Sequence, residues 1–343
     1  MNQSNDAHED IRRPMGALAC IVTGFEVVAR HPTLIILPLA LDLWLWLGPR
    51  LSIAPVLQGM KQLLLQTMLL DPDAAGTAES LAMLSQMLDE LSSGFNLFSA
   101  LNPGPLLGVP VLMPMRLGGE IPWGVQPTLE VGTIGLVILL SVLLALVGLG
   151  LNALYLHNVG RAVLDETAAE LPGPEDVFTL WRRLARLGIA LLVVGLLFSV
   201  AISLFVTLLG LINLAVAGLA LTLFSALGMF VVFHLLFTVP GMVQMRRGVA
   251  EAVRESMLLT RGDFLQTLLL LGLIMVVTQG LNVVWTLPPT DSWTAAVGLA
   301  GHAFVSTAVT AALFIFYQER LAFLRALVHF LSGQRNEAQV PSG

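Results

Sequence analysis

Charged residues are scarce in this sequence. Asp, Glu, Lys and Arg account for 12% of its 343 residues, whereas 56% are hydrophobic. Because a soluble domain carries about 25% charged residues, this composition argues against a water-facing surface of ordinary polarity. Residues 131–155 and 187–245 contain no charged residue, and about 20 apolar residues are enough for a helix to cross a bilayer. The sequence therefore predicts an integral membrane protein rather than a soluble protein with a large apolar core.

Cysteine is nearly absent as well. Cys20 is the single cysteine, which excludes a disulfide within the chain. The opening MNQSNDAHEDIRRP is polar, whereas a cleavable signal peptide begins with a basic segment that leads directly into an apolar one. We therefore expect no cleavage, with insertion through the first span. The net charge of −6 offers no basic surface for nucleic acid, so a nucleic-acid partner is not expected.

Long apolar runs separated by polar segments predict an all-α integral membrane protein, in which a six-span helical bundle carries interfacial amphipathic helices and an outer helical segment. Residues 1–32 are expected to form a cytoplasmic N-terminus with an interfacial helix at 15–29, and residues 318–343 a cytoplasmic tail. The predicted spans are 33–51 and, within 131–317, about 131–156, 187–211, 215–239, 264–285 and 294–317, with an amphipathic helix at 241–263 before the fifth of the six.

Residues 52–130 are the least regular part and form the expected extracytoplasmic segment. Two amphipathic helices are predicted here, at 56–70 and 77–95, because apolar residues recur at helical spacing. Residues 101–127 are apolar but rich in proline and glycine. They form either a loop packed on the helices or a re-entrant segment shielded by protein. The packed loop is favoured, because unpaired backbone at membrane depth is costly.

The basic residues give the expected orientation. With six spans, fourteen of the 17 Lys and Arg residues fall on the side that carries both termini, and the other side holds Arg50, Lys61 and Arg116. Lys and Arg near span ends favour the cytoplasm, so both termini are predicted to lie there, with the chain in the inner (cytoplasmic) membrane. The outer segments carry eight acids, which we interpret as a solvated face.

Four polar residues within predicted spans are candidates for a functional path: Asp42, His234, His302 and Asn282. A charge near mid-bilayer is costly and marks a functional candidate. Asp42 also lies close to Trp44, near the outer interface, where it would simply bond to a neighbouring helix. The histidines lack metal-ligand spacing, so we expect each to be neutral and bonded to a backbone carbonyl, and Asn282 to bond between helices. No catalytic motif, cofactor site or metal site is predicted.

Residues 240–264 form the most motif-like stretch. Arg246, Arg247, Arg254 and Arg261 accompany an apolar stripe, which predicts an interfacial helix whose arginines meet lipid phosphates. The pattern A–x–x–E–S–x–x–L–x–R–G–x–F from Ala252 to Phe264, followed by a span, resembles uncharacterised bacterial polytopic membrane families. Among them is the membrane domain that accompanies some glycerophosphoryl diester phosphodiesterases, and the opening HPTLIILPLALDL is similar to theirs. The resemblance implies a fold and no activity, since the chain has no candidate phosphodiesterase domain.

Two functions are consistent with these features. The first is a non-enzymatic scaffold or lipid-interacting component of the envelope, with membrane lipids and other membrane proteins as partners. The alternative is a transporter or permease for a small or lipid-like solute, with Asp42, His234 and His302 along its path. An intramembrane enzyme would need paired acid and base residues or a nucleophile, which the sequence does not supply.

Overall fold

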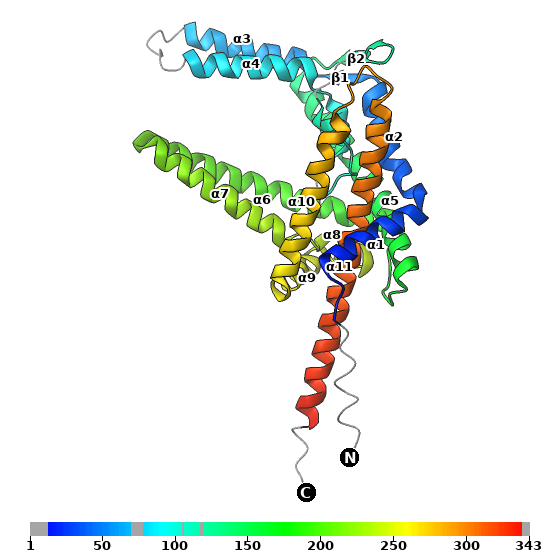
Figure 1. The fold of residues 1–343 in the computed structure, drawn as a ribbon. Helices are drawn as coiled ribbons and strands as arrows, with labels where there is room; N and C mark the ends of the chain where they lie inside the picture. Colours follow the sequence, from blue (N-terminus) through cyan, green and yellow to red (C-terminus); the bar gives the residue numbers. More distant parts are fainter. Residues whose placement is uncertain (1–12, 70–77, 105, 117–119, 338–343) are drawn as a thin grey trace. The chain divides into compact units, whose positions relative to one another are not determined.

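The structure is a computed structural model that describes residues 13–69, 78–104, 106–116 and 120–337 (Figure 1). Contacts divide the chain into two units. Unit 1 comprises Met1–His31, Leu156–Val277 and Ala308–Gly343, and unit 2 comprises Pro32–Tyr155 and Thr278–Thr307. The helices are α1 (Ala17–Arg30), α2 (Ile36–Leu47), α3 (Ala54–Leu69), α4 (Ala78–Gly94), α5 (Ile134–Thr167), α6 (Val177–Ile212), α7 (Leu214–His234), α8 (Thr238–Gln244), α9 (Val249–Gly262), α10 (Phe264–Thr286) and α11 (Ala295–Glu337).

Helices long and apolar enough to cross a membrane confirm the predicted all-α membrane bundle. Among the described residues there are five such segments: Ile134–Thr167, Val177–Ile212, Leu214–Gln244, Phe264–Thr286 and Ala295–Val328. A sixth is present if Ala17–Arg30 and Pro32–Leu47, which are bent by 93° relative to each other, form one span. The protein is therefore a multi-pass membrane protein.

The predicted first span, 33–51, is not one continuous helix. It consists of the 3-10 helix η2 (Pro32–Ile35) and the 12-residue helix α2, and the backbone becomes extended at Arg50. Twelve helical residues measure about 18 Å, which is short of a hydrocarbon core about 30 Å thick. Pro32 explains the sharp break from α1, because the residue before a proline is disfavoured in helical geometry.

In unit 1, α6 and α7 form a long antiparallel hairpin (Figure 1). Asn213 makes the turn, and its Oδ1 accepts hydrogen bonds from the N–H groups of Ala215 (2.9 Å) and Val216 (3.3 Å). Phe198 and Phe205 both pack edge-on against Phe224 across the hairpin. The most apolar stretch of α6 has no buried residue, so lipid is the solvent that this hairpin requires.

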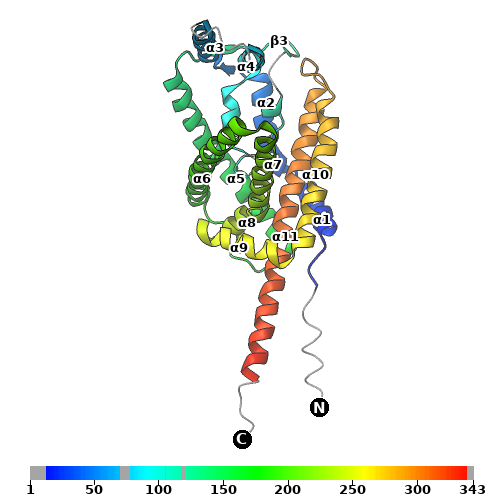
Figure 2. The ribbon, with the colours of Figure 1, turned by 90° about the vertical axis from the view of Figure 1, so that its left-hand side faces the viewer.

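The structure differs in one respect from the predicted span at 215–239 and the predicted amphipathic helix at 241–263. The chain is interrupted after His234 and again near Arg246, so that the short helix α8 separates α7 from α9. Ser256 of α9 stabilises the first interruption: its Oγ donates to the carbonyl of His234 (2.6 Å) and accepts the N–H of Phe237 (3.0 Å). Within unit 1, α9 runs across the ends of α6 and α7 (Figure 2).

In unit 2, short strands and a packed loop join the helices. Strand β1 (Arg50–Ser52) pairs in parallel with β4 (Thr128–Glu130), and β2 (Glu120–Ile121) pairs antiparallel with β3 (Gly124–Val125). The 3-10 helices η4 (Leu97–Leu101) and η5 (Met113–Met115) lie in the proline- and glycine-rich segment. Side chains of this segment are buried, among them Leu101, Leu107, Val109, Val111 and Leu112. Such burial is expected both of a loop packed on the helices and of a re-entrant segment shielded by protein, and the segment is called the packed loop below.

Candidate functional site

Asp42 lies fully buried on α2 in unit 2. Its Oδ1 accepts hydrogen bonds from the backbone N–H groups of Leu112 (2.8 Å) and Met113 (2.8 Å), and its Oδ2 also accepts from Leu112 (3.0 Å). These residues lie at the start of η5 in the packed loop, where the first N–H groups of a helix have no partner within the helix. A buried backbone N–H must find an acceptor, so the carboxylate of Asp42 anchors the loop to α2. This geometry fits a structural hydrogen-bonding role for Asp42 rather than a place in a functional path.

The other polar candidates are not gathered into one cluster. Nδ1 of His302 lies 3.9 Å from Oδ2 of Asp42 in unit 2, and its Nε2 is 3.2 Å from Ser306 Oγ. The predicted bond to a backbone carbonyl is therefore wrong for His302, since no such carbonyl bonds to its ring among the described residues. Nδ1 of His234, in unit 1, is bonded to the Phe230 carbonyl at 2.9 Å, as predicted. Asn282 was predicted to bond between helices, but its Oδ1 is buried and has no hydrogen-bond partner within the described ranges. Among the residues that the structure describes, no three His, Cys, Asp or Glu side chains are placed to hold a metal.

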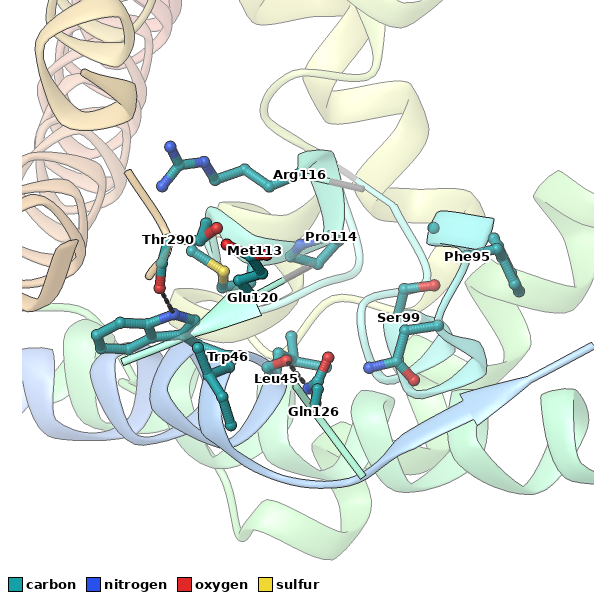
Figure 3. Close-up of a pocket in the computed structure, with 13 residues that line it drawn as sticks. Leu45, Trp46, Phe95, Ser99, Met113, Pro114, Arg116, Glu120, Gln126 and Thr290 are labelled. Atoms are coloured by element: carbon teal, nitrogen blue, oxygen red, sulfur yellow. Dashed lines mark hydrogen bonds between the residues drawn. The ribbon is translucent and has the colours of Figure 1, made fainter. Parts of the chain in front are cut away.

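A small pocket of unit 2 lies beside this loop (Figure 3). Its volume is about 70 Å³, enough for a few water molecules. Several of its polar groups are already engaged: Trp46 Nε1 donates to the Thr290 carbonyl (2.9 Å), and Gln126 Nε2 donates to the carbonyls of Leu45 (3.1 Å) and Gly48 (2.7 Å). The pocket therefore lies where α2 is joined to Gln126, two residues before β4, and to the connection between α10 and α11.

Arg116 also stabilises this end of unit 2. Its Nη2 donates to the carbonyls of Thr286 (2.8 Å) and Pro288 (2.9 Å). These carbonyls lie at and just beyond the C-terminus of α10, where helix carbonyls lack partners within the helix. Partial burial lowers the pKa of the Arg116 guanidinium below its usual range, although an arginine stays protonated at neutral pH. The sequence places Arg116 on the expected outer side but gives no sign of this role, because its two partners lie 170 and 172 residues away in the chain.

The four arginines predicted to face lipid fall into two pairs in unit 1. Arg246 donates to the carbonyls of Gly173 (3.0 Å) and Pro172 (2.9 Å), and Arg247 Nε contacts Glu255 Oε2 at 2.9 Å. Glu255 in turn accepts the hydroxyl of Tyr317. Arg246 has a positive φ of 55°, so the backbone leaves the helical conformation here and changes direction between α8 and α9. Arg246 and Arg247 therefore connect parts of unit 1 to one another.

Arg254 and Arg261 are exposed on α9 and make no hydrogen bond or ion pair with any residue that the structure describes. They lie on one face of α9 with Leu258, which is 65% exposed, because positions i, i+4 and i+7 share a helix face. The opposite face is buried through Ala252, Ser256 and Leu259. The hydrogen bonds of Ser256 hold this face against the ends of α7 and α8, so the arginine face is directed outward.

The start of α6 carries two further exposed arginines, Arg182 and Arg186. Arg182 lies over the ring of Phe178, 5.0 Å from its centroid, and Phe178 is itself 60% exposed. Asp176 caps this helix by accepting the N–H of Thr179 (2.9 Å), and this bond lowers the pKa of Asp176 below its usual range. Exposed arginines next to exposed apolar side chains thus occur at the same end of unit 1 on two helices that contact each other.

Comparisons with protein-family models, with curated proteins and with solved structures found no match to this chain.

Proposed function

We propose that this protein is a non-enzymatic component of the inner membrane that binds anionic lipid headgroups through the outward face of α9. The observation that carries the proposal is the arrangement of Arg254, Leu258 and Arg261. Two guanidinium groups without a partner in the described part of the chain flank an exposed leucine, so the apolar side chain can enter the headgroup boundary while the arginines meet phosphates. Arg182 and Arg186, at the start of α6, add to the same basic end.

The charge distribution supports the proposed orientation. The segments on the side of both termini hold fourteen of the 17 Lys and Arg residues, and positive residues near span ends favour the cytoplasm. The inner leaflet is also the leaflet with a negative surface potential, to which each nearby Lys or Arg contributes about 1 kcal/mol of attraction. The orientation with both termini in the cytoplasm therefore brings α9 to the lipids that its arginines favour.

The transporter alternative has less support from the site geometry. A transport path needs polar groups that are free to contact the solute or the coupling ion. Asp42 is instead bonded to two backbone N–H groups of the packed loop. His234 is bonded to a carbonyl of its own helix. For this reason we place the lipid-binding component first, and the resemblance to phosphodiesterase-associated membrane domains adds no activity to it.

A double substitution, Arg254→Gln and Arg261→Gln, tests the proposal. Loss of about 1 kcal/mol per arginine corresponds to a roughly fivefold weaker affinity for each, so binding of phosphatidylglycerol to the purified protein should weaken by about 25-fold. The measurement is native mass spectrometry of lipid-bound species during a lipid titration. The unfolding midpoint should not change, because neither side chain has a partner among the described residues.

The double variant Arg246→Gln and Arg247→Gln is the matched control. It removes the same charge from the same segment, but it also removes the bonds to Pro172, Gly173 and Glu255. We therefore expect a lower unfolding midpoint and a smaller loss of lipid affinity than for the pair at 254 and 261. Equal lipid affinity of the wild type and the Arg254→Gln, Arg261→Gln variant would contradict the proposal.

A further inference from the structure

Helices α3 and α4 form an antiparallel hairpin in unit 2. Lys61 Nζ contacts the two carboxylate oxygens of Asp89 at 2.8 and 2.6 Å, which joins the helices, and Leu88 of α4 is buried. Within the same unit, the hairpin runs across the direction of residues 295–307 of α11 (Figure 1). Helix α11 is one of the candidate spans, so a bilayer crossed by this helix would have the hairpin along its plane rather than through it.

Helical geometry tells which side chains share a side of this hairpin. The less exposed side chains place the seam between the helices at Lys61 and Leu64 on α3, and at Leu84 and Leu88 on α4. Each residue turns the helix by about 100°, and the two chains run in opposite directions. Positions one residue before the seam positions therefore fall on the same side of the pair. These positions are Met60, Leu63, Met83 and Met87.

The side defined by these four residues, here called the methionine side, is apolar and exposed. Met60 is 48% exposed, Leu63 63%, Met83 76% and Met87 51%. The opposite side carries Gln62, Ser85 and Asp89, and Leu65, which is 46% exposed, is its large apolar residue. Four of the five exposed large apolar side chains described for this hairpin are thus on one side, which makes the hairpin amphipathic as a unit.

We propose that the methionine side rests in the interfacial region of the lipid bilayer at this end of unit 2. An amphipathic helix that lies in the membrane plane buries its apolar face at the boundary of headgroups and acyl chains. Methionine is unbranched and flexible, so its side chain adapts to a fluid lipid surface.

The charge of the segment indicates which lipid is bound. Residues 54–94 contain five acidic residues and one lysine, so they would repel anionic headgroups. The lipid partner is therefore zwitterionic. This inference does not rest on the arginine face of α9, which belongs to unit 1 and for which anionic lipid is proposed.

Two pairs of single cysteines test the inference in the full-length chain with Cys20→Ala. Met60→Cys and Gln62→Cys lie two residues apart on opposite sides of α3. Met87→Cys and Ala82→Cys are the corresponding pair on α4, with Ala82 on the stripe of Ser85 and Asp89. All four native residues are exposed, so a cysteine with an attached fluorophore can be accommodated. Each labelled protein is reconstituted into phosphatidylcholine vesicles and exposed to iodide, or to lipid with a nitroxide near its headgroup.

We expect iodide to quench the fluorophore at 60 and 87 several-fold less than at 62 and 82, and the nitroxide lipid to quench in the reverse order. Equal access of iodide to both members of each pair would overturn the inference. So would protection of 60 and 87 that appears only in native membranes and not in pure lipid, because a protein partner would then cover the methionine side. Neither result depends on the affinity of α9 for phosphatidylglycerol.

Discussion

Replacing Asp42 by alanine is expected to destabilise unit 2 by about 2–6 kcal/mol, because each buried N–H group left without an acceptor costs about 1–3 kcal/mol. Asp42 accepts the N–H groups of both Leu112 and Met113 and is 0% exposed. No other described residue is bonded to these two groups. Asp42→Asn should have a smaller effect, because it keeps one acceptor oxygen near the two N–H groups.

Ser141→Ala is the control for the Asp42 variants. Among the described residues, Ser141 Oγ is bonded only to the Val137 carbonyl of its own helix, at 2.7 Å, and that carbonyl keeps its helical hydrogen bond when the hydroxyl is removed. The free energies of unfolding are measured by denaturant titration of the purified proteins in one detergent. If Asp42→Ala were as stable as Ser141→Ala, Asp42 would not anchor the loop, and its alternative role as part of a functional path would gain support.

Gly148→Ala is expected to cause the second large loss of stability. A Cβ atom at position 148 on α5 would lie 2.0 Å from the carbonyl oxygen of Leu101 and 2.6 Å from its carbonyl carbon. Both atoms are backbone, so α5 and η4 must move apart rather than adjust one side chain. Overpacking of this kind costs about 1–3 kcal/mol or more, and the lower stability should appear as a lower thermal unfolding midpoint.

Gly135→Ala is the matched control for this substitution, because it lies on the same helix. A Cβ atom at position 135 meets nothing within 4 Å, and alanine has a higher helix propensity than glycine. The unfolding midpoint of Gly135→Ala should equal or exceed that of the wild type. Equal midpoints for Gly148→Ala and Gly135→Ala would show that η4 does not pack on α5 as described.

The sequence predicted the apolar helices because lipid-solvated helices leave a long uncharged run. The fifth predicted span, 264–285, agrees closely with α10 (Phe264–Thr286), and the sixth, beginning at 294, agrees with the start of α11 at Ala295. Its end is different. Helix α11 continues to Glu337, because the residues after 317 keep helical spacing although they are no longer uniformly apolar.

The interruptions around α8 were not predictable from the local sequence. The break after His234 depends on Ser256, and the break near Arg246 depends on the carbonyls of Pro172 and Gly173. These partners lie 22 to 74 residues away. A long apolar run with one proline predicts a continuous span or a simple end, since nothing in the run itself identifies a distant hydroxyl or carbonyl.

The sequence predicted which arginines belong to the candidate site, but not that they separate into two pairs with different roles. Four arginines in 240–264 indicated a basic interfacial helix, yet only the structure separates Arg254 and Arg261 from Arg246 and Arg247. Helical spacing alone places 254 and 261 on one face of α9. The internal partners of Arg246 and Arg247 come from the 172–173 segment and from Glu255, and the first of these requires the tertiary fold.

The orientation of the chain is the claim on which the proposed lipid preference depends, and labelling in intact cells tests it most directly. Single cysteines replace Gln62 on α3 or Arg261 on α9 in the Cys20→Ala background, and a membrane-impermeant maleimide is added. We predict that the cysteine at 62 is labelled in intact cells, whereas the cysteine at 261 is labelled only after the membrane is permeabilised. Labelling of position 261 from outside the cell, with position 62 protected, would contradict the account.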